Sequence, residues 1–457
     1  MDIKLNQTYE IEIIDMGHGG EGIGKIDGFT IFVEETVIGD KVKIGITTLK
    51  KNYGIGKVVK YLEYSPFRVN PQCTIFYQCG GCQIQNISYK KQLETKKKII
   101  SDNLRRIGGL HELQIHDVIG MESPERYRNK AQFPLTDKNG QIEIGFYRKK
   151  SHDIIQCDTC MIQHEINDKI IKEIKHIIKK FKLSIYNEKT GKGLLRHIVT
   201  RIGVNSKEFM LILVVNGTHL PNKDEMIEDI KEKLPEITTL VQNINTKKSN
   251  VILGDQNITL YGKGYIMDSI AGIRFQISPL SFYQVNPVQM EKLYSKALEY
   301  AQLSGNETVF DLYCGIGTIS LFLAKKAEKV IGVEIVEAAV EDAQRNAEIN
   351  HIENTEFHVG KAEEVVPELY KKGYKADVVV VDPPRKGCDE KLLATMIKMQ
   401  PNRIVYVSCN PSTLARDLKH LEANGYKTIE AQPVDMFPHT AHVESIVLMT
   451  NSGLKGK

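Results

Sequence analysis

No apolar stretch in the 457-residue sequence is long enough to cross a bilayer. The longest, such as MLILVV at 210–215, are far shorter than the roughly 20 residues that a membrane helix needs. The start, MDIKLNQTYEIEIID, carries charge where a secretory signal has an apolar segment. Low-complexity tracts and internal repeats are also missing. We therefore expect no membrane association, and a cytoplasmic globular protein of roughly two to four domains.

The net charge of +4 is small, but the basic residues are unevenly distributed. Six lysines and no acid lie between Lys41 and Lys60, and seven basic against two acidic residues lie between Lys90 and Arg106. A solvated protein face explains one such cluster, but phosphate groups also bind to clusters of this kind. Two of them favour a nucleic-acid partner.

The pattern of predicted strands and helices divides the chain into three parts. Residues 1–62 contain short strand patterns separated by glycines, which predicts a small closed β-barrel. Residues 63–272 mix strand and helix patterns, so we expect an α+β central domain. Residues 273–457 alternate strands and helices, with continuous apolar runs such as DVVVVD that are typical of parallel strands buried on both faces. The fold expected there is α/β, a doubly wound sheet.

The segment VFDLYCGIGTISLFLA, 309–324, has the pattern strand, glycine turn, helix. Gly315 and Gly317 allow the backbone to turn sharply and to approach a ligand at the carboxyl edge of the sheet. Glu334 ends the next strand, where an acid can accept hydrogen bonds from a ribose diol. These features predict a nucleotide-like ligand.

A second motif narrows the choice of ligand. In VVVDPPRKG, 379–387, Asp382 and two prolines end a later strand. Asp382 could simply cap a helix while the prolines shape a turn. The glycine turn, however, departs from the G-x-G-x-x-G of dinucleotide sites. An acid followed by two prolines resembles the class I S-adenosylmethionine methyltransferases.

Cys409 lies in VYVSCNPSTLARDL, 405–418, at the end of an apolar strand pattern and before a helix. A cysteine at a strand end is often only a small buried hydrophobe. Here the carboxyl edge of the sheet places it beside the ligand, and the helix N-terminus is expected to lower the thiol pKa. A second acid, Glu444, begins a late apolar strand.

A thiolate and a carboxylate beside S-adenosylmethionine suit methylation at carbon 5 of a uracil. Carbon 5 is a weak nucleophile, and addition of a thiolate to carbon 6 activates it by forming an enolate. A base must later remove the proton from carbon 5 so that the thiol can leave. The residues thus predict Cys409 as the nucleophile and Glu444 as the base.

The motifs SCNPSTLARDL, DPPRKG, FDLYCGIG, SFYQVNP and HVES occur together in this chain. Together they resemble the RNA (uracil-5-)-methyltransferase family, and the resemblance covers nearly the whole chain. It implies a Rossmann-like class I S-adenosylmethionine methyltransferase domain, with an OB-like TRAM barrel that binds RNA at the N-terminus. It also implies formation of 5-methyluridine in 23S rRNA. One form of such an enzyme is the gram-positive type, which modifies two uridines.

The resemblance also implies roles for individual residues. Gln284, in SFYQVNP, matches the family glutamine near the cofactor and the target base. Tyr313 and Glu334 match cofactor-binding positions, and Asp382 matches the acid between cofactor and substrate. Ordinary loop packing is the alternative for Gln284 and Tyr313. The expected cofactor contacts are Gln284, Tyr313, Gly315, Gly317, Glu334 and Asp382.

Cysteines cluster in the central region as Cys73-x5-Cys79-x2-Cys82, followed downstream by CDTC, 157–160. Three close thiols and a distant one suit a [4Fe–4S] cluster held by Cys73, Cys79, Cys82 and Cys160, with Cys157 left over. Two Cys-x2-Cys pairs, Cys79/Cys82 and Cys157/Cys160, suit zinc as well. The resemblance to the ribosomal branch favours the iron–sulfur cluster, with a structural role.

The expected partner is 23S rRNA in a single-stranded or loop segment, from which the target uridine is flipped into the site. Phe29, Phe32 and Tyr53 are candidates for stacking on bases, and the basic–aromatic stretch 126–134 is a candidate for the RNA channel. A monomer fits RNA surfaces spread over three domains. Two alternatives remain: a tRNA uracil-5-methyltransferase, against which the barrel and the cysteines argue, and a non-catalytic RNA-binding scaffold.

Overall fold

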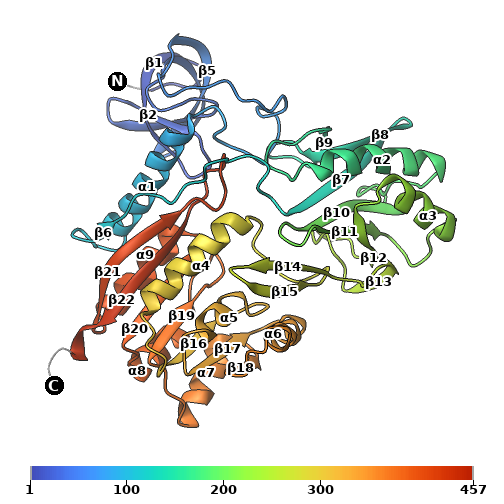
Figure 1. Ribbon diagram of the computed structural model, residues 1–457. Helices are drawn as coiled ribbons and strands as arrows, with labels where there is room; N and C mark the ends of the chain where they lie inside the picture. The colour runs from blue at the N-terminus through green and yellow to red at the C-terminus, as the bar shows by residue number, and fades with distance from the viewer. Residues whose placement is uncertain (1–2, 455–457) are drawn as a thin grey trace.

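The computed structural model describes residues 3–454, which form a barrel and two sheet-based units (Figure 1). The barrel is closed in the order β1-β2-β3-β5-β4, as the sequence predicts. Alternate isoleucines and valines point inward and make a core of their own. Its strands are β1 Thr8–Met16, β2 Gly22–Ile26, β3 Phe29–Val33, β4 Lys41–Leu49 and β5 Tyr53–Glu63.

The central unit is a seven-stranded sheet in the order β13-β12-β11-β10-β7-β8-β9. Helices α2 (Ile166–Lys180) and α3 (Lys223–Lys233) pack their apolar sides on one face. The strands are β7 Lys130–Lys138, β8 Gln141–Tyr147, β9 Ile154–Gln156, β10 Leu195–Gly203, β11 Glu208–Val215, β12 Ile237–Ile244 and β13 Gln256–Tyr261.

A hairpin of β14 (Ile266–Ile270) and β15 (Ile273–Ile277) links the central unit to the C-terminal unit (Figure 1). Its buried residues belong to a single apolar cluster that extends from the inner faces of β10, β11 and β12 to helices α4 and α5. The two sheets are therefore held together by a continuous core.

The C-terminal unit is an eight-stranded sheet in the order β18-β17-β16-β19-β20-β22-β21-β6. Strands β16 to β20 run parallel, and β22 pairs antiparallel with both β20 and β21. This confirms the expected α/β class. The strands are β16 Thr308–Leu312, β17 Lys329–Glu334, β18 Thr355–Val359, β19 Val378–Val381, β20 Arg403–Ser408, β21 Tyr426–Val434 and β22 Glu444–Asn451.

Helices cover both faces of this sheet, since one apolar cluster lies on each side of the buried strands. A short 3-10 turn, Ser452–Leu454, ends the described part of the chain. None of the helices in the described part of the chain is long and apolar enough to span a membrane. The helices are α4 Pro287–Ala301, α5 Thr318–Ala324, α6 Glu337–Ile349, α7 Ala362–Lys371, α8 Glu390–Met399 and α9 Pro411–Glu422.

An early segment completes the C-terminal unit. Helix α1 (Tyr89–Arg106) lies against α9, and β6 (Gln114–Ile115) pairs with β21 at the edge of the sheet (Figure 1). Both elements fall within 63–272, the range that the sequence suggests for the central domain. The domain boundaries stay a prediction, but the C-terminal sheet draws on residues from both sides of the central unit.

Candidate active site

The register of two adjacent strands brings Cys409 and Glu444 together. Strands β20 and β22 pair antiparallel, and the last pair of the ladder is Ser408 with Ser445. Cys409 and Glu444 are the next residues beyond this pair, and both lie at the carboxyl edge of the parallel strands. The charge of Glu444 acts on the Cys409 thiol and raises its pKa, so the two side chains are near one another. A thiol and a carboxyl group 35 residues apart in sequence therefore meet at one edge of the sheet.

Asp382 joins them from the neighbouring strand. It follows β19 directly, where Val381 pairs with Tyr406 of β20, so it lies at the same edge. Burial raises the pKa of Asp382, and burial together with the charge of Asp382 raises the pKa of Glu444. Oε2 of Glu444 is buried and has no hydrogen-bond partner within the described chain.

The same two carboxylates affect the pKa of the Cys409 thiol. Burial is the main cause that raises its pKa, and the charges of Glu444 and Asp382 raise it further, while Arg385 lowers it. The prediction that this pKa is lowered is wrong, because desolvation and two carboxylates raise it. Arg385 is a residue that sequence reasoning did not place in the site, although it lies in the quoted motif DPPRKG.

The glycine turn between β16 and α5 has the expected form. Gly315 has φ +55° and Gly317 has φ +79°, and an added Cβ at Gly315 would meet no atom within 4 Å. The open space at Gly315 leaves room for a ligand against the backbone. Glu334, at the end of β17, accepts hydrogen bonds from the N–H groups of Gly315 at 3.1 Å and Val336 at 2.9 Å. Tyr313, at φ +67°, packs beside the turn.

Two buried polar groups extend this site. Burial raises the pKa of Asp311, in β16, to about 7. Ser320 donates a hydrogen bond to Oδ2 of Asp311 at 2.5 Å, and Oδ1 of Asp311 has no partner in residues 3–454. Tyr294 of α4 is buried, and burial and the charge of Asp382 raise its pKa. Its hydroxyl is 3.1 Å from that of Thr318. Asp311 stands in the quoted motif FDLYCGIG, whereas no sequence signal marks Tyr294.

Gln284 lies in the segment 278–286, which crosses from β15 to α4. Its side chain is 6% exposed, and its backbone carbonyl accepts a hydrogen bond from Asn129 at 3.0 Å. Asn286, two residues on, donates to the carbonyl of Met436 at 3.0 Å. The segment thus bridges the central unit and the loop before Glu444, while the expected cofactor contact of Gln284 stays a prediction.

Comparison with known protein families accounts for this arrangement. The model of the tRNA (uracil-5-)-methyltransferase family matches residues 88–452, and the TRAM domain model matches residues 4–59. The chain belongs to the tRNA (uracil-5-)-methyltransferase family. It is thereby an S-adenosylmethionine-dependent RNA methyltransferase with an N-terminal TRAM domain, as the sequence motifs predict.

Relatives of this family member extend over its whole length. RNA methyltransferases from Bacillus cereus and Clostridium tetani, both described as uncharacterized, are each 52% identical to it. The match to the B. cereus protein covers 98% of this chain and 97% of that protein. The match to the C. tetani protein covers 100% of this chain and 99% of that protein. A crystal structure of the Pyrococcus abyssi tRNA (uracil-54, C5)-methyltransferase with S-adenosyl-L-homocysteine is 30% identical, with a TM-score of 0.77, covering 97% of this chain and 100% of that one.

The Pyrococcus enzyme removes one argument made from the sequence. We expected the barrel and the cysteine region to argue against a tRNA substrate. A tRNA enzyme that aligns with 97% of this chain extends over the barrel, so the barrel by itself does not distinguish rRNA from tRNA enzymes.

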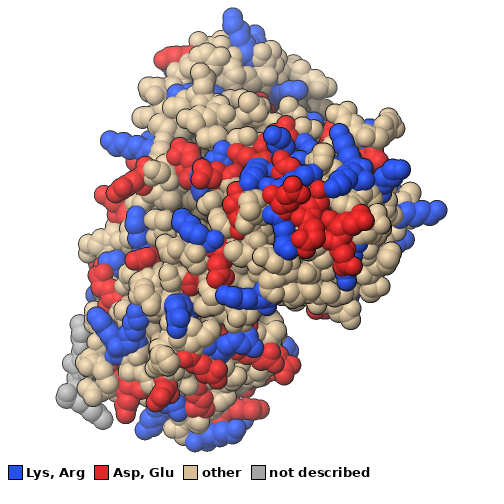
Figure 2. Space-filling model, turned by 45° about the vertical axis from the view of Figure 1, so that its right-hand side comes forward, with Lys and Arg blue, Asp and Glu red and all other residues tan. Residues whose placement is uncertain are grey.

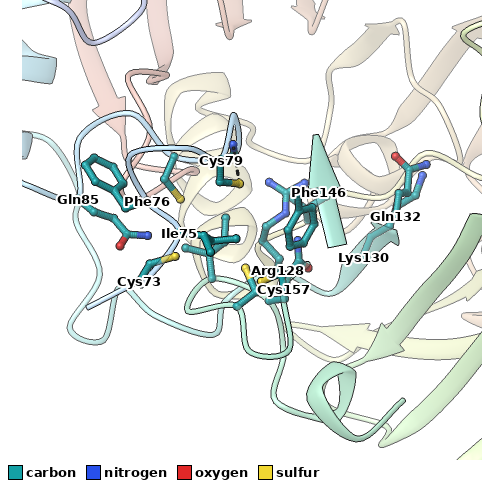
Figure 3. A pocket seen from close by; sticks show the side chains of 16 residues that line it. Cys73, Ile75, Phe76, Cys79, Gln85, Arg128, Lys130, Gln132, Phe146 and Cys157 are labelled. Carbon is teal, nitrogen blue, oxygen red and sulfur yellow. Dashed lines mark hydrogen bonds between the residues drawn. The ribbon is translucent and has the colours of Figure 1, made fainter. Parts of the chain in front are cut away.

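Five cysteines of this methyltransferase line one cavity of about 390 Å³ between the segment 73–85 and the start of β7 (Figure 3). The expected ligands are all among them, and so is Cys157, which was expected to be left over. Cys157 lies within hydrogen-bond reach of Cys160, whose pKa this bond lowers to about 7. The five cysteines are Cys73, Cys79, Cys82, Cys157 and Cys160.

The thiols around the cavity do not form a closed metal site. Within residues 3–454, no group of three or more Cys, His, Asp or Glu side chains is arranged to hold a metal ion. This finding bears equally on the zinc site and on the iron–sulfur cluster, and the choice between them stays a prediction. Five thiols border a cavity instead.

Many basic residues of the segment 90–106 take part in ion pairs, and its contact with phosphate stays a prediction. Lys96 is fully buried against Asp435. Ion pairs also occupy four other basic residues: Lys91, Lys97, Lys98 and Arg106. On the face drawn in Figure 2, acidic and basic side chains are likewise interspersed. Charge counting along the segment missed the pairs with Asp15, Asp117 and Asp435, which lie outside it, whereas Glu94 and Asp102 pair with basic residues within it.

Proposed function

We propose that this protein methylates carbon 5 of uridine in 23S rRNA, with Cys409 as the nucleophile and Glu444 as the base. The observation that carries the chemistry is that the ladder of β20 and β22 ends at Ser408 and Ser445, next to the thiol and to a buried carboxyl group with one unpartnered oxygen. A structural cysteine needs no such neighbour, and burying a carboxyl group without a full set of partners is costly.

The first step is addition to the base. Cys409, which is partly exposed, loses its proton to water, and the charge of Arg385 favours the thiolate. The thiolate forms a bond to carbon 6 of the uracil, and the electron pair of the C5–C6 double bond moves to give an enolate. Carbon 5 then takes the methyl group, whose bonding electrons remain with the sulfur of the donor.

Glu444 completes the reaction. Its carboxylate takes the proton from carbon 5, the C5–C6 double bond forms again, and the Cys409–C6 bond breaks to release the thiolate. A raised pKa makes Glu444 a stronger base than a solvated carboxylate. The unpartnered Oε2 leaves a lone pair free to receive the proton.

The methyl donor, S-adenosylmethionine, supplies an electrophilic methyl group. Several residues at the sheet edge fit it: the open backbone at Gly315 gives space, and Glu334 can accept hydrogen bonds from ribose hydroxyls with its remaining lone pairs. Tyr313, Gly317 and Gln284 are assigned to the same ligand by their motifs. The motif of Asp382 assigns it to the junction of cofactor and substrate, where its carboxyl group would orient the two reactants.

We assign the cysteine cavity to a [4Fe–4S] cluster with a structural role, held by Cys73, Cys79, Cys82 and Cys160. The donor set of thiols suits iron, and a cluster of four irons and four sulfides separates its ligands more widely than one ion does. Visible absorbance and iron content of protein purified without oxygen test this. Cys79→Ser should lose the colour and unfold at a lower temperature; a colourless wild type would end the assignment.

Two classes of RNA are candidate substrates. The match of the cysteine pattern to the ribosomal branch supports 23S rRNA. The Pyrococcus tRNA enzyme, which resembles this chain over nearly its full length, favours tRNA as the second candidate. In either RNA the target base must leave its stack to reach Cys409 at the sheet edge.

Methyl transfer from labelled S-adenosylmethionine to unmodified 23S rRNA and to unmodified tRNA, with nucleoside analysis of the product, separates these candidates. We expect 5-methyluridine in rRNA with the wild type and none with Cys409→Ala. Label in tRNA alone would keep the chemistry and overturn the substrate. Binding of the cofactor without transfer to either RNA would indicate the non-catalytic scaffold.

A further inference from the structure

Two tyrosines stack where the barrel ends. Tyr61 lies near the end of β5 and Tyr64 follows the strand, and their rings are 5.0 Å apart with planes inclined by 26°. The guanidinium of Arg68 lies over both rings, 4.9 Å from the centre of Tyr61 and 5.7 Å from that of Tyr64. We call Tyr61, Tyr64, Arg68 and the nearby Tyr77 the tyrosine platform; they line a cavity of about 570 Å³.

Buried contacts hold the platform rigid. Asp40, which is fully buried, accepts hydrogen bonds from Nε and Nη2 of Arg68 and from the backbone N–H of Ser65. Arg68 also donates to the carbonyl of Glu35 at 3.0 Å. Since Asp40 neutralises Arg68, the guanidinium acts as a flat stacking surface and not as a phosphate ligand.

The stacking surface faces solvent. Tyr64 is 64% exposed and Tyr77 is 44% exposed, although a globular protein normally covers such rings at least in part. Two lysines stand directly opposite each other on the adjoining strands, Lys43 on β4 and Lys60 on β5. Lys43 also faces Glu10 of β1 on its other side. Side chains alternate along a strand, so Lys60 and Tyr61 point to opposite faces of β5. Flat exposed rings are a surface on which single-stranded nucleic acid stacks its bases.

Tyr77 connects the platform to the cysteine cavity. It comes from the segment 73–85, and its ring is 5.0 Å from that of Phe76, which lines the cysteine cavity. The same segment donates from the backbone N–H groups of Gln83 and Ile84 to the carbonyl of His439, in the loop before Glu444. RNA on the platform would thus lie at one end of a segment whose other end contacts the catalytic loop.

We propose that the tyrosine platform is a second RNA-binding site, which stacks unpaired bases of the substrate outside the catalytic pocket. The inference rests on the proposed RNA substrate. Because every base has an aromatic face, the platform tolerates any sequence and contributes affinity, not the choice of uridine. Lys43 and Lys60, on the adjoining strands of the barrel, hold phosphates of the RNA that continues past the platform.

Fluorescence anisotropy with a labelled single-stranded RNA of mixed sequence tests the platform. Tyr64→Ala and Tyr77→Ala should each weaken binding about 5- to 100-fold, the range for loss of one base stack. Tyr64→Phe keeps the ring and should bind like the wild type. Tyr370→Ala is the matched control, since Tyr370 is 37% exposed on α7 in the other sheet unit and should leave affinity unchanged.

Salt dependence separates stacking from charge. The tyrosine variants should keep the wild-type slope of affinity against salt, whereas Lys60→Ala should lower it by about one unit. Tyr64→Ala and Tyr77→Ala binding as tightly as Tyr370→Ala would overturn the platform. In methyl transfer, Tyr64→Ala should raise KM and keep kcat. A wild type that transfers no methyl group refutes the proposed function, while the anisotropy result still decides the platform.

Discussion

Lys96 of α1 and Asp435 of the loop before β22 form an ion pair from which solvent is excluded, with Nζ 2.5 Å from Oδ1. Lys96 also donates to the carbonyl of Phe437 at 3.0 Å, and Tyr89 donates to Oδ2 of Asp435 at 2.9 Å. Burial lowers the pKa of Lys96, and the charge of Asp435 acts against that change. This pair fixes the loop that ends at Glu444.

Breaking this pair should destabilise the protein strongly. Lys96→Met or Asp435→Asn leaves one buried group without its partner, at a cost of about 3–5 kcal/mol in the free energy of unfolding. Removal of both groups together should cost less than either single change, and urea denaturation measures all three. Lys91→Met is the control: Lys91 pairs with Glu94 at the surface, and its loss should cost about 0–1 kcal/mol. Equal effects of Lys96→Met and Lys91→Met would contradict this account.

Glu444→Gln should trap RNA on the protein. Addition of Cys409 and methylation of carbon 5 need no base, whereas release of the thiol does. With unmodified RNA and S-adenosylmethionine, the variant should give a covalent complex that survives denaturing electrophoresis. Cys409→Ala and the double variant should give none. A trapped complex with Glu444→Gln that persists after Cys409 is replaced would assign the nucleophile to another residue.

The reactivity of the Cys409 thiol should depend on three charges. Its pKa is raised, so the rate of alkylation by iodoacetamide should increase with pH through a range above the usual thiol value of about 8.5. Glu444→Gln removes a negative charge that raises the pKa and should move the profile to lower pH. Arg385→Gln removes a positive charge that lowers it and should move the profile to higher pH. Mass spectrometry of the Cys409 peptide gives the rates, and shifts in one common direction would refute this electrostatic account.

Gly317→Ala should weaken cofactor binding. The residue has φ +79°, and an added Cβ would lie 3.1 Å from Cβ of Ala343 and 3.3 Å from the ring of Phe357. The N-terminus of α5 must shift to make room, at about 1–2 kcal/mol for the backbone conformation alone. Calorimetric titration with S-adenosylhomocysteine measures the affinity. Gly425→Ala, at φ +95° with no atom near the added Cβ, tests the backbone cost alone and should leave the affinity unchanged.

Much of the fold follows from local sequence patterns. The barrel follows from glycine-separated strands of alternating apolar residues, and the parallel sheet follows from apolar runs such as Val378–Val381. The turn at Gly315 and Gly317 follows from the need for positive φ at a tight strand-to-helix connection. Such signals are short-range, so one sequence is enough to read them.

The sequence by itself also determined which groups are available for chemistry: a cysteine after one strand, an acid at the start of another, and five central thiols. Only the tertiary structure decided how they act. Strand pairing brings the segments of Cys409 and Glu444 together at one edge of the sheet. Burial raises the thiol pKa, opposite to the expected direction. Lys96 is buried in an ion pair with Asp435, although 339 residues separate them. Desolvation and Coulomb interactions depend on distances in space, which a linear pattern of residue types does not contain.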